Sequence, residues 1–391
     1  MKSVRDIDVT SKKVFVRVDY NVPMDENQNI TDDNRIVATL DLIEYLVDKK
    51  ARIILASHLG RPDGKFDHRF SLEPACRRLS ELINKPVEFA DDCIGPDVEK
   101  KVSKLCDGQI LMLENLRFHK GEKKNDDEFS KQLAGLCDVY INNAFAVSHR
   151  DQASVTGIPR FVREAGAGFL LEKEVNSYYD SVENPRRPLV AVIGGAKVSS
   201  KLGALENMLR FVDKLLIGGA MANTFLKSQG IDTKGSMIEK DLVSRAAQIV
   251  DKAREKSVEL MLPEDLVCAE KFDKDASIVE TRVDNIPDMW MALDIGPATA
   301  SVYAGALAGA GTIVWNGPMG VFEMEKFMAG TRTVAEAIAQ SGAFSIVGGG
   351  DTGLAAKKCG VADRVSYVST GGGAFLHLME GKKLPGVVAL E

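Results

Sequence analysis

The chain has 391 residues, and a single hydrophobic core usually organises fewer residues than this, so we expect about two domains. Its content of 45% hydrophobic and 27% charged residues excludes a disordered chain, a coiled coil and a small disulfide-stabilised protein. The net charge of −6 argues against a general nucleic-acid-binding protein.

Targeting signals and membrane segments are missing from the sequence pattern. The longest nearly apolar stretch, around Leu215–Leu226, is shorter than the roughly 20 residues of a membrane span. The N-terminal residues MKSVRDIDVT are charged and lack the apolar segment of a secretory signal. The six cysteines include no Cys-x-x-Cys pair, which favours unpaired thiols in a reducing compartment. We therefore expect a cytoplasmic protein without membrane or nucleic-acid partners.

Short apolar runs alternate along the chain with amphipathic stretches of helical period, and each run ends in a polar or glycine-rich corner. Most runs are continuous, which is typical of strands covered on both faces by helices, and the alternation predicts parallel sheets. The strands expected in the first half are Val14–Val18, Arg52–Ala56, Ile110–Leu113 and Val139–Ile141. Those expected in the second half are Leu189–Ile193, Lys214–Ile217, Val258–Leu262, Thr312–Trp315, Phe344–Val347 and Val365–Val368.

A boundary between domains is predicted near the middle of the chain. Residues 168–182 have the pattern of a helix. The sequence Asn-Pro-Arg-Arg-Pro, residues 184–188, ends this helix, because a residue before proline disfavours the helical conformation. We expect an N-terminal domain over residues 1–167, a connecting helix over 168–184 and a C-terminal domain over 185–373. The predicted fold is α/β, with two doubly wound parallel-sheet domains joined by a helix and a cleft between them.

Ligands of open α/β sheets bind beyond the carboxyl ends of the strands, so the corners indicate the chemistry. In the first half these corners carry arginine and histidine, whose charge suits a small anion with carboxylate or phosphate groups. The charged and polar residues at or near these corners are Arg17, Asp19, Asn21, Arg35, His58, Arg61, Arg117, His149 and Arg150.

The corners of the second half carry glycine instead, which lets backbone N–H groups approach a polyphosphate. The clearest are Gly194-Gly195-Ala196-Lys197, Asn316-Gly317-Pro318 and Gly348-Gly349-Gly350-Asp351-Thr352. No P-loop sequence is present. Gly348-x-Gly350-x-x-Gly353 matches a dinucleotide-binding fingerprint, which keeps a dinucleotide-dependent oxidoreductase as an alternative. However, Asp351 would repel a bare pyrophosphate and suits Mg²⁺ better.

Taken in order, these motifs resemble those of the phosphoglycerate kinase family over essentially the whole chain. They are Arg17–Pro23, Ser57–Pro62, Glu114–Phe118, Gly194–Val198, Trp315–Glu323 and Gly348–Thr352. The resemblance implies a monomeric, hinge-bending glycolytic enzyme that transfers phosphate between MgATP and the carboxylate of 3-phosphoglycerate, giving ADP and 1,3-bisphosphoglycerate.

The resemblance also implies site residues. The expected 3-phosphoglycerate ligands are Asp19, Asn21, Arg35, His58, Leu59, Gly60, Arg61, Arg117 and Arg150. The expected nucleotide ligands are Lys201, Glu323, Gly349, Gly350, Asp351 and Thr352, with Asp351 binding the metal. Lys197 and Arg35 are the expected catalytic residues. The C-terminal segment, residues 374–391, is expected to pack back on the N-terminal domain.

One loop departs from the family pattern, because Ala146, Val147 and Ser148 replace the usual Gly-Thr-Ala before His149 and Arg150. The mechanism expected is electrostatic: the acceptor carboxylate is already ionised, so no general base is needed, and positive groups must offset the repulsion between two anions. Besides the oxidoreductase, a two-lobed anion-binding protein that closes on its ligand remains a non-enzymatic alternative.

Overall fold

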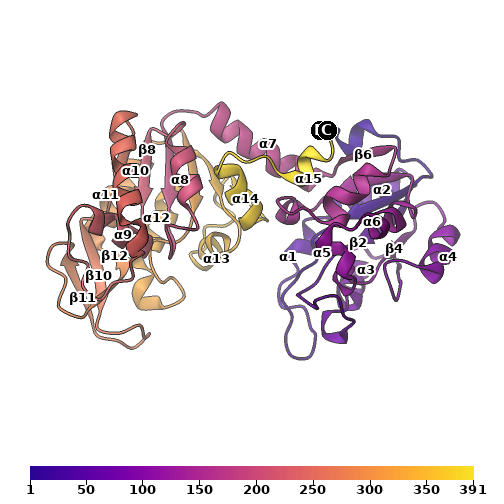
Figure 1. Cartoon of the computed structure of the whole chain (residues 1–391), viewed down its shortest axis with the longest axis horizontal. Coiled ribbons are helices and arrows are strands. Elements are labelled where there is room, and N and C mark those ends of the chain that lie inside the picture. The colour runs from indigo at the N-terminus through magenta and orange to yellow at the C-terminus, as the bar shows by residue number, and fades with distance from the viewer. The chain divides into compact units, whose positions relative to one another are not determined.

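The computed structural model describes all residues from Met1 to Glu391. The chain forms two compact units, and each is built on its own six-stranded parallel sheet (Figure 1). The first unit comprises Met1–Val175 together with Lys383–Glu391, and the second comprises Asn176–Lys382. Two parallel-sheet α/β domains are therefore present, as the sequence predicts.

The first sheet has the strand order β3-β4-β2-β1-β5-β6, with every pair parallel. Its strands are β1 Lys13–Arg17, β2 Arg52–Ala56, β3 Val87–Phe89, β4 Ile110–Met112, β5 Val139–Asn142 and β6 Glu164–Ala167. In β1, β2, β4 and β5 nearly every residue is buried, which explains their continuous apolar sequences. The edge strands β3 and β6 are not predicted, because they are short and β6 reads Glu-Ala-Gly-Ala.

The second unit has the sheet order β15-β14-β13-β7-β8-β9, also parallel throughout. Its strands are β7 Leu189–Ile193, β8 Lys214–Ile217, β9 Glu259–Met261, β13 Thr312–Asn316, β14 Phe344–Val347 and β15 Tyr367–Val368. All six lie within a residue or two of predicted positions. The central strands β7 and β13 are buried along their whole length.

A third sheet in the second unit is not predicted. It is antiparallel, has the order β11-β10-β12, and consists of β10 Asp265–Ala269, β11 Ile278–Arg282 and β12 Met291–Ile295. Strand β11 alternates between exposed and half-buried residues, so it lacks the continuous apolar run that identifies the parallel strands. The sequence Met291-Ala-Leu-Asp-Ile295 of β12 is interrupted by a carboxylate, Asp294, which is nevertheless buried.

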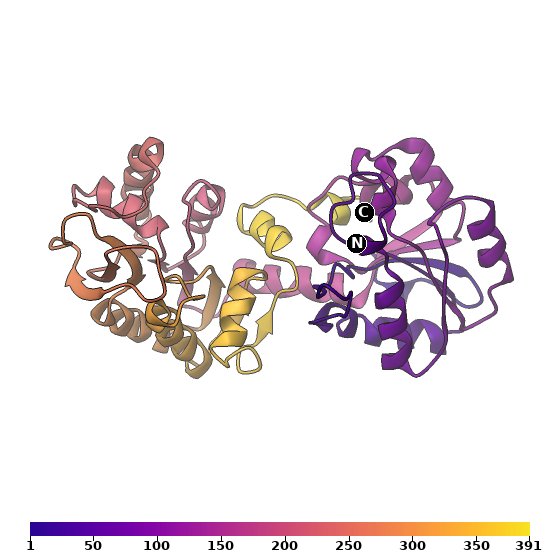
Figure 2. The same cartoon turned by 90° about the horizontal axis from the view of Figure 1, so that it is seen from below.

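Helices lie on both faces of each parallel sheet (Figures 1 and 2). Those of the first unit are α1 Asn34–Val37, α2 Leu40–Asp48, α3 Glu73–Ile83, α4 Pro96–Lys104, α5 Lys120–Lys124, α6 Asp127–Ala134 and α15 Pro385–Val388. Those of the second are α8 Leu202–Met208, α9 Met221–Ser228, α10 Val243–Glu255, α11 Pro297–Ala308, α12 Ala329–Gln340, α13 Asp351–Lys358 and α14 Gly372–Met379. Helix α7, Phe169–Glu183, begins in the first unit and ends in the second. None of these helices combines the length and apolar character needed to cross a bilayer.

The C-terminal segment returns to the first unit at Lys383, later than the expected Ala374. Helix α14 stays with the second unit, where the Tyr178 hydroxyl donates to the Leu378 carbonyl (2.7 Å) and the Asn207 amide donates to the Met379 carbonyl (2.9 Å). In the first unit the N–H of Gly386 donates to the Ser148 carbonyl (2.9 Å). Both chain termini consequently lie close together on that unit (Figure 2).

Candidate functional site

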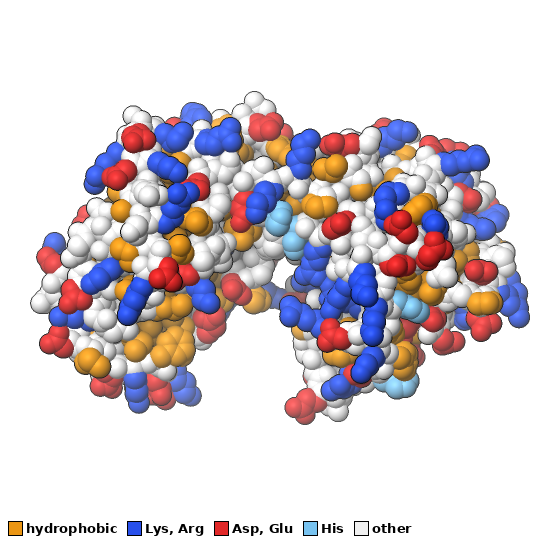
Figure 3. Space-filling model, viewed as in Figure 1, with side chains coloured by type: hydrophobic (Ala, Val, Ile, Leu, Met, Phe, Trp, Pro, Cys, Tyr) orange, Lys and Arg blue, Asp and Glu red, His pale blue; other side chains and the backbone are white.

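Basic residues converge at the carboxyl ends of four neighbouring strands in the first unit. Arg17 is the last residue of β1, residues 58–61 follow β2, Arg117 follows β4 and Arg150 follows β5. Because these strands are adjacent, in the order β4-β2-β1-β5, their corners meet at one edge of the sheet. Arg35 joins them from the short helix α1. Lys and Arg side chains form a visible group on this unit (Figure 3).

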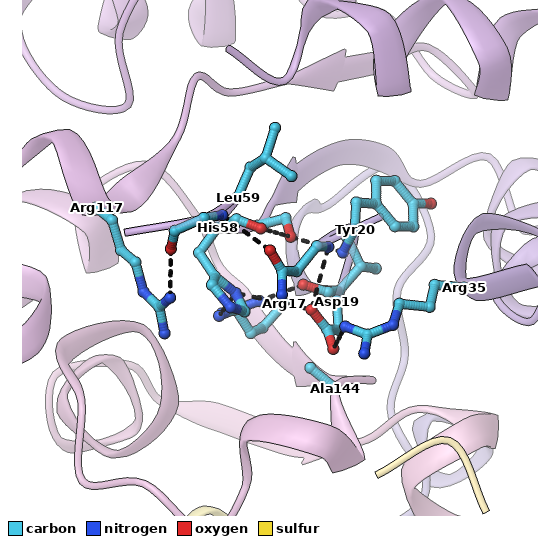
Figure 4. Close-up of polar contacts among 12 residues, drawn as sticks. Arg17, Asp19, Tyr20, Arg35, His58, Leu59, Arg117 and Ala144 are labelled. Atoms are coloured by element: carbon cyan, nitrogen blue, oxygen red, sulfur yellow. Dashed lines mark hydrogen bonds and ion pairs between the residues drawn. The ribbon is translucent and has the colours of Figure 1, made fainter. Parts of the chain in front are cut away.

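Arg17 lies at the centre of this basic cluster and is completely buried. Its Nη2 lies 3.1 Å from His58 Nδ1, its Nη1 donates to the Val18 carbonyl, and its Nε donates to Ser154 Oγ at 2.8 Å (Figure 4). The hydroxyl of Ser154 in turn donates to the buried carboxylate of Glu122 (2.7 Å). A buried carboxylate therefore compensates the buried guanidinium through one serine. Arg17 is not among the ligands that the resemblance implies.

Asp19 organises the side of the cluster nearest Arg35. Its Oδ2 accepts a hydrogen bond from Arg35 Nη1 at 2.6 Å, and its Oδ1 lies 3.7 Å from His58 Nδ1 (Figure 4). The side-chain oxygen Oδ1 of Asn21 accepts from the N–H of Gly60 (2.8 Å), which ties the corner after β1 to the corner after β2. These two corners are thus held in a fixed register.

The corner after β2 depends on Gly60, whose φ of +60° lies in the left-handed region. A Cβ there would lie 2.3 Å from the Phe70 ring. The Gly60 carbonyl accepts from Arg117 Nη1 (2.7 Å), and the Leu59 carbonyl accepts from the Asn115 amide (2.8 Å). Arg61 is the exposed member of this corner. The structure therefore brings all the expected first-unit residues to one place.

The guanidinium groups are close enough to disfavour one another's charge. Burial lowers the pKa of Arg117 to about 10, and the charges of Arg150 and Arg17 act in the same direction. Burial also lowers the pKa of Arg150, although Asp19 opposes the shift. The pKa of His58 is held well below its ordinary value by burial and by the neighbouring arginines, so its imidazole is neutral at pH 7. Such an excess of positive charge is what a multiply charged anion would neutralise.

Arg117 has one further property that points to a ligand. Its Nε is buried and has no hydrogen-bond partner within the protein. A buried N–H group without a partner is costly, so a bound acceptor would stabilise it.

The loop that departs from the family pattern has its own packing. Val147 is buried and forms a small apolar cluster with Ala144 and Val155. The Ser148 hydroxyl donates to the Ala144 carbonyl (3.0 Å). Val147 therefore takes a core position, whereas Arg150 still reaches the basic cluster.

The second unit contains a pocket of about 440 Å³ at the carboxyl ends of β7, β13 and β14. It is lined by residues 194–197, 200–201, 316–318 and 349–352 and by the start of α14. Lys197, Lys201 and the expected loop Gly349–Thr352 are therefore brought together. All the expected nucleotide ligands line this pocket except Glu323, which lies outside it.

Glycine is required in this pocket because its corners touch backbone to backbone. A Cβ at Gly349 would lie 2.7 Å from the Gly372 nitrogen, and a Cβ at Gly194 would lie 2.1 Å from the Pro318 oxygen. Gly350 caps the N-terminus of α13 with φ of +66°. The start of α13 therefore presents backbone N–H groups and the positive end of the helix dipole to the pocket.

Two lysines line the same pocket with different surroundings. Lys201 is half-buried and donates to the side-chain oxygen of Asn316. Burial lowers the pKa of Lys201 to about 8, although the nearby charge of Asp351 opposes the shift. Lys197 is exposed at the corner after β7, and the Ser199 hydroxyl in the same loop donates to Glu239 (2.5 Å).

Glu323 is also exposed and lies beside a separate hollow lined by Asp273 and Lys274. Lys358, the last residue of α13, donates to the Glu323 carbonyl at 3.0 Å. Asp351 is the first residue of that helix, so the helix axis separates the two ends by about 10 Å. Glu323 thus lies near the C-terminal end of α13, whereas Asp351 begins that helix at the pocket.

The loop that carries Glu323 is held by residues that sequence reasoning missed. The buried carboxylate of Asp294 accepts from the N–H groups of Gly330 (2.8 Å) and Ile295 (2.9 Å). A Cβ at Gly320 would lie 2.2 Å from Asp294 Oδ1. Thr331 Oγ1 accepts from the N–H of Met319 at 3.0 Å. No sequence signal marks these residues, because their partners come from other elements.

The residues of the pocket suit Mg²⁺. The Asp351 carboxylate is exposed at the start of α13, beside Lys201. Mg²⁺ prefers oxygen ligands and commonly binds through one or two carboxylates together with substrate phosphates. Thr352 Oγ1 accepts from the N–H of Gly317 (2.8 Å), so its main contact joins two loops of the pocket.

Comparisons with known proteins agree along the whole chain. A family model described as phosphoglycerate kinase matches residues 4–382. Among curated proteins, the phosphoglycerate kinase of Desulforapulum autotrophicum is 66% identical with full coverage of both chains. That of Desulfosudis oleivorans is 56% identical, covering 100% of this chain and 99% of the relative.

Solved structures of phosphoglycerate kinases are also similar to this chain. The structure of phosphoglycerate kinase from Coxiella burnetii has a TM-score of 0.90 at 45% identity, covering 100% of this chain and 98% of that one. That from Pyrococcus horikoshii has a TM-score of 0.86 at 34% identity with the same coverage. The chain therefore belongs to the phosphoglycerate kinase family, whose members are kinases that transfer phosphate to a carboxylate.

Proposed function

We propose that this enzyme catalyses reversible phosphoryl transfer between MgATP and the carboxylate of 3-phosphoglycerate, giving ADP and 1,3-bisphosphoglycerate in glycolysis. The observation that carries the proposal is the pair of anion sites, one in each unit and built by different means. One uses guanidinium side chains, and the other uses glycine-lined backbone and a helix N-terminus.

In the first unit, the basic cluster would bind 3-phosphoglycerate. The proposed ligands are Asp19, Asn21, Arg35, His58, Leu59, Gly60, Arg61, Arg117 and Arg150. The unpartnered Nε of Arg117 supports this assignment, because an acceptor on the ligand would satisfy it. Arginine is suited to the task, since its planar fork matches carboxylate and phosphate oxygens and remains charged at neutral pH.

In the second unit, the glycine-lined pocket would bind the nucleotide. Gly349, Gly350 and Thr352 would face the phosphates together with Lys201, whereas Glu323 would bind the ribose hydroxyls. The position of Glu323 at the far end of α13 supports this order along the ligand. Asp351 would hold Mg²⁺, which supplies positive charge to the phosphates when bound.

The transfer step itself requires positive charge more than proton transfer. The acceptor carboxylate is ionised at neutral pH, so no general base is required. Lys197 and Arg35 would stabilise the negative charge on the transferring group, each from its own unit. The exposed position of Lys197 at the mouth of a glycine corner supports this, because its ammonium group is free to reach the phosphate.

Both ligands must meet for the reaction to occur, although their sites belong to different units. We propose that the units close on each other when both ligands are bound, with α7 and the adjoining segments as the hinge, and that the enzyme works as a cytoplasmic monomer. Closure would also exclude water from the transferring phosphate. Small-angle scattering should show compaction only when both substrates are present.

A coupled activity assay with ATP and 3-phosphoglycerate tests the proposal. Lys197→Ala should reduce kcat by about 10²–10³ while leaving nucleotide affinity nearly unchanged, as for other donors that act in the transition state. Lys256→Ala is the matched control, because Lys256 is exposed at the end of α10, outside the pocket. Wild-type turnover in the Lys197 variant would refute the role of this lysine, and no turnover in the unmodified enzyme would refute the reaction.

A further inference from the structure

Three potential metal ligands meet in the first unit, outside the basic cluster. Asp92 and Cys93 follow strand β3, and His119 follows the 3₁₀ turn Leu116–Phe118. The carboxylate, thiol and imidazole ligand atoms all lie within 4.8 Å of one another. Asp92 and Cys93 are neighbours in the sequence, and the fold brings His119 to them from a different segment.

Their geometry is close to that of a metal site. Asp92 Oδ1 lies 2.6 Å from His119 Nε2 and also accepts from the N–H of Cys93 (2.6 Å). Ligand atoms on a tetrahedral zinc ion are about 3.3–3.6 Å apart, given bonds of about 2.0–2.3 Å. Movements of about 1 Å by side chains would therefore convert the present arrangement into a coordination sphere.

The ligands are also supported by their neighbours. The His119 ring stacks on Phe129 with 5.3 Å between centroids, which fixes its orientation. The Cys93 side chain is completely buried, whereas the Asp92 side chain is 50% exposed. The cluster therefore has two oriented ligands and one side open to water. That combination leaves room for a water molecule as a fourth ligand.

Negative charge around the thiol favours a cation over the alternatives. The buried carboxylate of Glu122 lies close enough to the Cys93 thiol to interact with it electrostatically. Glu114 adds a second buried carboxylate, close enough to interact with Asp92. These carboxylates would attract a cation bound at the three ligands.

We propose that Asp92, Cys93 and His119 bind one Zn²⁺ ion with water as the fourth ligand. The donor set of thiolate, imidazole and carboxylate is the one zinc prefers, and it excludes Mg²⁺ and Ca²⁺, which need oxygen ligands. The site is separate from the proposed nucleotide site, and the proposal does not depend on the reaction catalysed. Occupancy would link the end of β3 to the segment Glu114–His119, which carries Arg117.

Cobalt binding to the whole chain tests the site directly. The protein is first treated with a chelator and assayed without Mg²⁺ or nucleotide. Titration with Co²⁺ should give a near-ultraviolet thiolate-to-cobalt charge-transfer absorption that saturates at one equivalent and disappears when Zn²⁺ is added. His119→Gln should weaken Co²⁺ binding by at least about 100-fold, and Cys93→Ser should abolish the absorption.

Matched variants separate the site from other histidines and thiols. His68→Gln removes an exposed histidine of the same unit, and Cys76→Ser removes another buried thiol, so both should leave the titration unchanged. His119 is only partly buried, and its substitution keeps the thiol, so that variant remains informative if Cys93→Ser does not fold. A chelator-treated protein with no saturable absorption, an absorption retained in Cys93→Ser, or unchanged affinity in His119→Gln would overturn the proposal.

Discussion

Asp294 is predicted to make the second unit less stable as pH rises, relative to a variant that cannot ionise there. Burial raises the pKa of this carboxyl to about 7, from an ordinary value of 3.8. The folded state therefore binds more protons than the unfolded state between these two values, and this contribution to the free energy of unfolding declines with rising pH. Across roughly pH 5 to pH 8, the linkage amounts to a loss of about 2–3 kcal/mol.

Asp294→Asn removes the titration but also one hydrogen-bond acceptor. At pH 5 the variant should be less stable than the wild type by about 1–3 kcal/mol, because the N–H of Gly330 or Ile295 loses its partner. At pH 8 that difference should shrink by about 2–3 kcal/mol or change sign, since only the wild type bears the cost of a buried charge.

Urea unfolding followed by tryptophan fluorescence measures this difference. Both tryptophans, Trp290 and Trp315, lie in the second unit, so the signal reports the unit that contains Asp294. Thr331→Val is the matched control, because it removes the acceptor of the Met319 N–H in the same loop without removing a titratable group. Its cost should not vary with pH. A difference between wild type and Asp294→Asn that stays constant or grows with pH would refute the reasoning.

Two further predictions concern the nucleotide pocket and the C-terminal segment. Burial lowers the pKa of Lys201 to about 8, so kcat/KM for ATP should fall above that pH as the lysine loses its charge. The variant Lys201→Arg should lack this alkaline decline. The same decline in both enzymes would exclude Lys201 as its origin. A Cβ at Gly386 would lie 2.7 Å from Val155, so Gly386→Val should destabilise the first unit by about 1–3 kcal/mol. Hydrogen exchange in β5 and α6 should detect that loss, and unchanged protection there would contradict it.

The parallel sheets could be predicted from sequence because burial on both faces leaves a direct trace. Strand β7 is apolar at every position, and the sequence predicts both of its ends correctly. The antiparallel sheet could not be located in this way, since β11 reads Ile-Val-Glu-Thr-Arg and is partly exposed on both faces. Short strands such as β6, which contains glycine and glutamate, form because a neighbouring strand supplies the hydrogen bonds.

The site residues show a similar division. Residues at strand ends, such as His58 and Asp351, could be predicted because the sheet topology places every carboxyl end at one edge. The burial of Arg17 could not, because its compensation by Glu122 passes through Ser154, more than a hundred residues further along the chain. The support that Asp294 gives to the Glu323 loop likewise depends on tertiary contacts alone.

The return of Lys383–Glu391 to the first unit affects how the protein is made in the cell. The second unit is one uninterrupted stretch, Asn176–Lys382, and can complete its fold as a nascent chain emerges from the ribosome. The first unit begins to emerge earlier but stays unfinished until residues 383–391 have been made, because Gly386 packs against Ser148 and Val155 only then. The codons for residues 383–391 therefore complete the unit whose synthesis began first.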